Sequence, residues 1–229
     1  MGSLNGTKNV VLPTQNAQVV VLSPNKQLLC AMTVLRDQET ETPAFVSAFQ
    51  LVAHQLMTAA LDLVPTESLV VITPTKSVYR GMRPTRRVCG ISILRAGASM
   101  EDSLRQSYSG PLSFGKILIQ RDEETCLPTH LYSKFPKDIA NRFVLILEPM
   151  LATGGSASKA IDLILEAGVP EQDIVFVNVM ASRKGIEVLT RQFPRLKIVT
   201  AAVDDDLTAS GHIAPGLGDF GDRYYGTAD

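Results

Sequence analysis

Nine consecutive residues, EPMLATGGS at 148–156, carry the groups best suited to chemistry in this chain. Two glycines between Thr153 and Ser156 form a turn before a predicted helix. The first turn of a helix has backbone N–H groups that are free to bind an anion, most often a phosphate. Glu148 would repel that phosphate directly, but its carboxylate can accept hydrogen bonds from neighbouring sugar hydroxyls. The pattern therefore indicates a ribose phosphate as the ligand, with an ordinary strand-to-helix turn as the alternative.

The loop 148–156 lies between two elements with clear apolar patterns. Residues 143–147 are apolar without a break, which is typical of a strand buried on both faces. From Ser156 onward apolar residues recur at helical spacing, and Gly168 follows as a natural helix end. The region 142–167 is therefore predicted to form a strand, a loop and a helix.

Arg95 occupies an equivalent position in a second strand–turn–helix unit. It follows the apolar run VCGISIL at 88–94 and precedes a predicted helix at 98–106. In a parallel sheet the carboxyl ends of the strands share one edge, where ligands bind. Arg95 is therefore expected to face the same crevice as residues 153–156, with a salt bridge at the strand end as the alternative.

Arg121 ends a third predicted strand, at 116–120, which places it on the same edge as Arg95. The charged run 121–125 would, on its own, indicate a solvated loop. Both arginines are thus candidates for binding the anionic part of a ligand.

Strands and helices alternate through the rest of the chain, with strands expected at 174–179 and 197–202 and a helix at 184–192. Alternation of this kind predicts a doubly wound α/β fold with a mostly parallel sheet. The length of 229 residues favours a single domain over 1–229.

The N-terminal part holds several further elements. Residues 1–24 are expected to form an irregular arm with one short strand near 19–22, followed by helices at 27–37 and 42–63. The segment 69–87 contains four arginines, and we expect a strand leaving the sheet and then a hairpin or arm. A solvated or subunit-contacting arm is favoured there over a binding patch.

Two further segments lack a regular apolar period. Residues 127–138 are expected to be a connection or small excursion. Residues 203–229, called the hood below, are rich in glycine, and a floppy tail would be the usual interpretation. Its apolar residues predict a folded lid instead: Ile213, Leu217, Phe220, Tyr224 and Tyr225.

Composition is typical of a soluble globular protein, with 45% hydrophobic and 20% charged residues. The formal net charge of −1 argues against nucleic-acid binding and against a polybasic membrane patch. Neither an apolar run long enough to span a bilayer nor a secretory signal is expected, so the cytoplasm is the default location. The three cysteines are far apart, which predicts buried thiols rather than disulfides or a zinc site: Cys30, Cys89 and Cys126.

Four blocks of the chain resemble one family. They are ILRAGASMED at 93–102, RDEET at 121–125, LEPMLATGGS at 147–156 and GHIAPGLGDFGDRYYGT at 211–227. Together they resemble the uracil phosphoribosyltransferases, a branch of the type I phosphoribosyltransferases, in their eukaryotic-like form. The resemblance runs from about residue 23 to the end, and the last block is the most specific. It implies a type I phosphoribosyltransferase fold with a β-hairpin arm and a base-binding hood.

The resemblance implies the reaction of uracil with phosphoribosyl pyrophosphate to give UMP and pyrophosphate, with magnesium as the cofactor. Arg95 and Arg121 would contact the pyrophosphate, and Asp219 would support it through metal-bound water, so these three are the candidate catalytic residues. No residue is expected to bind the metal directly. The remaining phosphoribosyl pyrophosphate contacts would come from Glu148, Pro149, Met150, Leu151, Ala152, Thr153, Gly154, Gly155 and Ser156. The uracil contacts would come from Ile213, Gly218, Asp219 and Phe220.

Three residues differ from the usual family pattern. Glu148 stands where family members usually have Asp, His212 where Tyr is common, and Ala98 where many eukaryotic members have an acid. These differences put ribose placement, base preference and pH response in question. A non-catalytic uracil or nucleotide sensor and a transferase for another base therefore remain alternatives. The resemblance also implies a homodimer or homotetramer and, for some members, activation by GTP.

Overall fold

The computed structural model describes residues 18–121 and 128–227 of the chain. Within these ranges the centre of the molecule is an eight-stranded sheet in the order β1-β10-β9-β7-β4-β5-β6, with β8 also paired to β9. Neighbouring strands are parallel, except that β6 runs antiparallel to β5. The strands are β1 (Val19–Val21), β4 (Arg87–Leu94), β5 (Leu112–Arg121), β6 (Pro128–Lys134), β7 (Arg142–Leu147), β8 (Met150–Leu151), β9 (Ile174–Ser182) and β10 (Lys197–Asp204).

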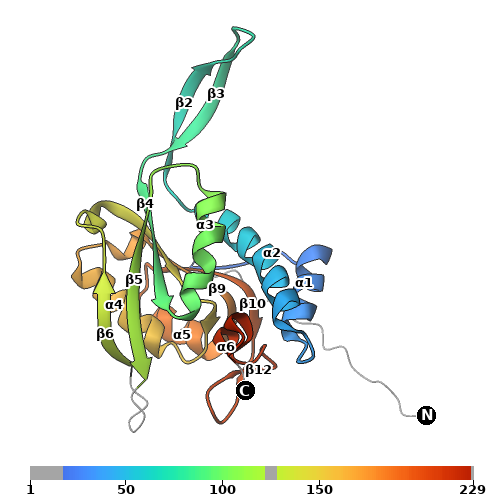
Figure 1. The fold of residues 1–229 in the computed structure, drawn as a ribbon. Coiled ribbons are helices and arrows are strands. Elements are labelled where there is room, and N and C mark those ends of the chain that lie inside the picture. Colours follow the sequence, from blue (N-terminus) through green and yellow to red (C-terminus); the bar gives the residue numbers. More distant parts are fainter. Residues whose placement is uncertain (1–17, 122–127, 228–229) are drawn as a thin grey trace.

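Helices cover both faces of this sheet, which confirms the predicted doubly wound α/β fold (Figure 1). One face packs against α1 (Lys26–Arg36), α2 (Thr42–Leu61) and α3 (Glu101–Ser107), and the other against α4 (Gly155–Glu166) and α5 (Arg183–Gln192). Short 3-10 turns occur at Ala96–Met100, Ile139–Asn141 and Glu171–Asp173. The parallel strands β7 and β9 are buried along most of their length because helices lie on both sides.

Helix α2 corrects the expectation that the chain has no apolar run long enough to span a bilayer. By length and composition alone, Thr42–Leu61 is long and apolar enough to cross a membrane. In the fold its apolar stripe, which includes Phe45, Phe49 and Leu56, is fully buried in the core against the sheet. The helix therefore serves as the central packing element of one layer.

A two-stranded arm projects from the body of the molecule. Among the described residues, strand β2 (Thr66–Ile72) pairs with β3 (Val78–Pro84) alone. Strand β2 therefore does not belong to the main sheet, although a strand leaving that sheet was expected. Figure 1 shows this arm at the end opposite to the hood. Its apolar side chains are exposed: Val70, Val71, Ile72, Val78, Tyr79 and Met82.

The expected connection at 127–138 is instead largely a strand, β6, on the edge of the sheet. Leu131 and Tyr132 are exposed there, so the apolar alternation that marks a half-buried strand is weak. An edge strand also tolerates Pro at its first position, which explains why the sequence pattern concealed it.

The hood is folded, as the sequence predicts. It consists of a small hairpin, β11 (Asp206–Leu207) with β12 (Ile213–Ala214), followed by α6 (Phe220–Tyr225). It lies at the end of the sheet toward which β4 and β5 point in Figure 1. Arg36 of α1 anchors it, because its guanidinium forms two hydrogen bonds to Asp204, at 2.7 and 2.8 Å, and a third to the carbonyl of Gly216 at 3.0 Å.

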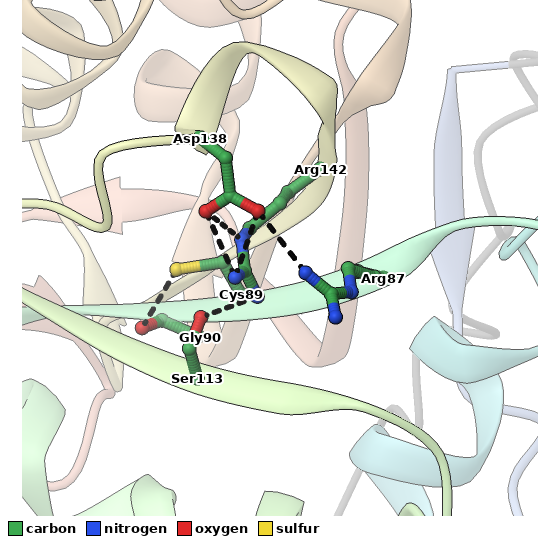
Figure 2. Close-up of polar contacts among 6 residues, drawn as sticks. All are labelled: Arg87, Cys89, Gly90, Ser113, Asp138 and Arg142. Atoms are coloured by element: carbon green, nitrogen blue, oxygen red, sulfur yellow. Dashed lines mark hydrogen bonds and ion pairs between the residues drawn. The ribbon is translucent and has the colours of Figure 1, made fainter.

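The opposite edge of the sheet, at the start of β4, β5 and β7, carries a polar cluster (Figure 2). Asp138 accepts two hydrogen bonds from Arg142, at 2.9 and 3.0 Å, and one from Arg87 at 3.4 Å. Arg142 also donates to Ser113 Oγ at 2.9 Å. The Arg142 hydrogen bonds hold the pKa of Asp138 below its ordinary value. The cluster ties the strand ends together far from the hood.

The cysteine prediction is correct for one residue and wrong for another. Cys89 is fully buried beside the polar cluster, and burial raises the pKa of its thiol. Cys30 is a free thiol and exposed, because it lies on the outer side of α1. Cys126 lies outside the described residues.

Candidate active site

A pocket of about 390 Å³ opens at the carboxyl edge of the parallel strands. Its wall combines the ends of β4 and β7 with the loop 150–156 and with residues 210–213 and 218–220 of the hood. Arg95 and Thr153 both line it, as expected from the strand–turn–helix pattern. Segments that are far apart in the sequence therefore share one cavity.

The first part of the loop is attached to strand β9. The backbone N–H of Glu148 donates to Val177 O at 3.2 Å, and the carbonyl of Pro149 accepts hydrogen bonds from Val179 N and Met180 N at 2.9 and 3.1 Å. Pro149 is buried behind the pocket wall, so its backbone holds the loop rather than facing the cavity.

The second part of the loop is held by the start of α5. Ser182 Oγ donates to the carbonyl of Ala152 at 2.5 Å and accepts a hydrogen bond from Gly185 N at 2.9 Å. A Cβ on Gly185 would lie only 2.6 Å from the Ala152 carbonyl oxygen. Glycine is therefore needed here for the close approach of α5 to the loop.

The turn at the end of the loop has the geometry of an anion site. Gly154 has φ +85°, a left-handed conformation that L side chains rarely adopt. Helix α4 then begins at Gly155 with no side-chain cap and no acidic residue in its first turn. The residues of this first turn line the pocket. The free N–H groups and the positive dipole end at a helix start favour phosphate binding.

Arg95 meets both expectations that the sequence left open. It lines the pocket, and its Nη2 atom also forms an ion pair with Asp222 Oδ1 of α6 at 3.0 Å. The backbone after Arg95 packs tightly against β7, since a Cβ on Gly97 would collide with the carbonyl oxygen of Leu147. The Leu94–Arg95 peptide bond is cis.

Two carboxyl groups lie in the pocket, on Glu148 and Asp219. Burial raises the pKa of Glu148 to about 8, and the nearby Asp219 adds to this rise, while a hydrogen bond from the backbone of Met150 opposes it. A bound cation or hydroxyl donors would favour the ionised form of Glu148. The Glu148 carboxyl group is therefore suited to contact sugar hydroxyls or a metal ion of a bound ligand.

The hood presents backbone rather than side chains to the pocket at Phe220. Phe220 is buried, and its ring packs against Phe45 and Phe49 with centroid distances of 5.6 and 5.0 Å. Since Phe220 also lines the pocket, its backbone is the part that a ligand can reach. Gly218, two positions before Phe220, has φ +81°.

Residues 21–227 match the family model described as uracil phosphoribosyltransferase. The chain is 47% identical over 211 residues to the uracil phosphoribosyltransferase of Dictyostelium discoideum, covering 92% of this chain and 97% of that protein. The chain belongs to the uracil phosphoribosyltransferase family.

Other comparisons agree with this membership. Identity to the Saccharomyces cerevisiae uracil phosphoribosyltransferase is 42% over 207 residues, which are 90% of this chain and 95% of that protein. The solved structure of the AQ2163 protein from Aquifex aeolicus superposes with a TM-score of 0.81 at 29% identity, covering 92% of this chain and 99% of the other. The chain is therefore a pentosyltransferase, and the comparisons give no support to the alternative of a non-catalytic regulator.

Most residues that the family resemblance assigned to substrates line this one cavity. They are Arg95, Glu148, residues 150–156, Ile213, Gly218, Asp219 and Phe220. Arg121 ends strand β5, but its side chain and residues 122–125 lie outside the described part of the structure. Of the three residues that differ from the family pattern, Glu148 and His212 line the pocket. A 3.0 Å hydrogen bond joins His212 Nδ1 and Ser210 Oγ.

Sequence reasoning did not find four residues that shape the site. Ser182 and Gly185 hold the loop, while Asp222 and Tyr225 contact Arg95. The run SRKG at 182–185 was a usable signal, because a Ser before a predicted helix is a common N-cap and here accepts from Gly185 N. No local signal pairs Asp222 with a residue 127 positions earlier.

Proposed function

We propose that this pocket transfers the phosphoribosyl group of phosphoribosyl pyrophosphate to N1 of uracil, giving UMP and pyrophosphate. One observation carries the proposal: Arg95, the turn 153–156 and the start of α6 converge on one cavity. The arginine suits a pyrophosphate, the turn suits a phosphate, and the hood backbone suits the polar edge of a base.

Each part of the substrate would have its own contact. The 5′-phosphate binds the N–H groups and hydroxyls of residues 153–156. The ribose hydroxyls donate to Glu148, whose carboxylate is one methylene longer than the Asp usual in the family. Arg95 and Arg121 bind the pyrophosphate, and backbone groups of Ile213, Gly218 and Phe220 bind the uracil edge, next to Asp219.

The chemistry then requires alignment and charge stabilisation rather than a covalent nucleophile. The C1–pyrophosphate bond breaks, the sugar carbon becomes electron-poor, and uracil N1 forms the new bond to C1 as its N–H proton is released to solvent. The leaving pyrophosphate accumulates negative charge, which the fixed guanidinium of Arg95 stabilises. The walls of the cavity restrict the orientation of the base toward the sugar.

The pocket suits magnesium held mainly by the substrate. Hard carboxylate oxygens of Glu148 and Asp219 are present, while the described residues contain no cluster of three or more His, Cys, Asp or Glu that would form a protein cage. Magnesium in such sites is bound through one or two carboxylates and substrate phosphates. When bound, it would neutralise charge on the pyrophosphate, with Asp219 acting through water.

A panel of bases tests the proposal directly. The purified protein is incubated with phosphoribosyl pyrophosphate, magnesium and radiolabelled uracil, hypoxanthine, adenine or orotate, and labelled nucleotides are separated. We expect UMP from uracil and little product from the other bases. No UMP would contradict the proposal, and preference for another base would change the substrate.

The partners form a second part of the proposal. We propose a homodimer or homotetramer in the cytoplasm that does not bind nucleic acid or membranes, supported by the near-neutral charge and the apolar arm. Activation by GTP stays a prediction of the family resemblance. Sedimentation and rate assays with and without GTP test both points.

A further inference from the structure

Helix α6 near the C-terminus contacts both the side chain and the backbone of Arg95. Besides the 3.0 Å ion pair with Asp222, the guanidinium lies 5.7 Å from the ring centroid of Tyr225. Tyr225 Oη also donates a 3.1 Å hydrogen bond to the backbone carbonyl of Arg95. Helix α6 therefore holds this arginine at both its backbone and its charged end.

Asp222 is itself held in place from two sides. Its Oδ1 atom accepts a 2.7 Å hydrogen bond from Thr227 Oγ1, and its backbone N–H donates to Asp219 Oδ1 at 3.0 Å. The Thr227 and Arg95 hydrogen bonds lower the pKa of Asp222, so it stays ionised near neutral pH. A fixed carboxylate of this kind defines where the arginine can point.

The ion pair leaves Arg95 able to bind a second anion. A guanidinium has five N–H donors, and the contact with Asp222 uses Nη2 only. The remaining donors are available to a phosphate while the ion pair persists. Since the Arg95 side chain is 60% exposed, it would otherwise lose much rotamer freedom when it binds an anion. The contacts with α6 hold the Arg95 side chain in place before the anion binds, which reduces this loss of conformational entropy.

The same helix also reaches the base side of the pocket. Asp219 caps α6 by accepting the N–H of Asp222, and Phe220 is the first residue of the helix. The ring of Phe220 stacks on Tyr224, the residue before Tyr225, at a centroid distance of 5.6 Å. Helix α6 thus connects the hood backbone at Phe220 with the residues that contact Arg95.

We propose that Asp222 and Tyr225 are positioning residues that hold Arg95 toward the pyrophosphate of phosphoribosyl pyrophosphate, so that α6 links the base side of the pocket to the leaving-group side. The inference rests on the proposed role of Arg95 in pyrophosphate binding. It assigns a role to the end of the hood beyond contact with the base.

Steady-state kinetics of Asp222→Asn test the inference. We expect the KM for phosphoribosyl pyrophosphate to rise about tenfold, the scale of one charge-assisted hydrogen bond, with kcat within about twofold. The KM for uracil, at saturating phosphoribosyl pyrophosphate, should not change. Asp222→Glu keeps the carboxylate and should recover most of the lost affinity.

A double-mutant cycle separates positioning from a general loss of structure. In an Arg95→Ala background the additional Asp222→Asn change should have no further effect on the KM, because the group it acts through is gone. Wild-type kinetics for Asp222→Asn, or an equal effect in both backgrounds, would overturn the inference while leaving the proposed function intact. An unchanged KM and kcat in Arg95→Ala itself would contradict the role of Arg95 and the inference together.

Tyrosine variants provide a matched pair on the same helix. Tyr225→Phe removes the hydroxyl that binds the Arg95 carbonyl and keeps the ring, so the KM for phosphoribosyl pyrophosphate should rise about threefold. Tyr224→Phe removes a neighbouring hydroxyl that is not hydrogen-bonded within the described residues, and its KM should stay at the wild-type value. Equal kinetics for the two variants would count against the role of Tyr225.

Discussion

Arg95 is the single side chain on which the proposed chemistry depends most. It is the arginine in the described part of the pocket wall, and the charge of the departing pyrophosphate needs a fixed cation. Its placement follows from the packing of Gly97 against β7 and from the contacts with α6.

Arg95→Ala should lower turnover by about 100–1000-fold, the effect of removing one preorganised stabilising group from an active site. Rates of UMP formation at saturating substrates measure this. Arg191→Ala changes an exposed arginine of α5 away from the pocket and is the control. Turnover of Arg95→Ala equal to that of the control would refute the role.

The pKa of Glu148 links this residue to stability. Its value of about 8 in the fold exceeds the ordinary value of 4.5, so the folded protein binds this proton more tightly than the unfolded chain does. The resulting contribution to stability is fully present below about pH 4.5 and is lost as the pH rises through 8.

Glu148→Gln mimics the protonated group and should remove this dependence. Without ligands, the free energy of unfolding of the variant minus that of the wild type should increase by at least about 1 kcal/mol between pH 5 and pH 9. Urea unfolding at several pH values measures the difference. Glu166→Gln, an exposed change at the end of α4, is the control, and parallel curves for Glu148→Gln and the wild type would contradict the expectation.

At the scale of elements, the start of α5 acts as a support for the loop 148–156. Ser182 and Gly185 both contact Ala152, and neither residue lines the pocket. The anion-binding turn thus depends on a helix that follows it by about 30 positions in sequence.

Gly185→Ala should displace this loop, because the new methyl group would lie 2.6 Å from the Ala152 oxygen and 2.9 Å from that of Leu151. We expect a loss of stability of about 1–3 kcal/mol and a KM for phosphoribosyl pyrophosphate raised about tenfold. Lys184→Ala alters the adjacent exposed position and should change neither quantity. An unchanged KM in Gly185→Ala would show that the loop does not depend on this contact.

At the scale of the whole molecule, the arm is the feature that the single chain does not explain. A two-stranded hairpin is marginally stable alone, and this one exposes a row of apolar side chains to solvent. Contact with a second copy would bury them, in agreement with the proposed homo-oligomer.

Replacing Ile72 and Val78, which face each other across the arm, by serine should therefore weaken assembly. Sedimentation should shift from an oligomer toward the 24.8 kDa monomer. Leu131→Ser, at an exposed position of β6 on the main sheet, is the control and should sediment as the wild type does. An unaltered sedimentation coefficient in the arm variant would place the subunit contact elsewhere.

The layered fold and the positions of Arg95 and the loop 148–156 could be predicted from local sequence patterns alone. Strands β7 and β9 are buried on both faces, so their continuous apolar runs are local signals, and a parallel sheet brings the ends of its strands to one edge. Glycine-rich turns at helix starts are local signals as well.

The residues that support that site could be identified only once the chain was folded. Asp222 reaches Arg95 across 127 positions, and Gly185 matters because the Ala152 carbonyl lies against it. The edge strand β6 and the pairing of β2 with β3 outside the main sheet were obscured for the same reason. The strands they pair with, and not their own apolar patterns, determine where they lie in the fold. Contacts between segments that are distant in sequence depend on how the layers pack.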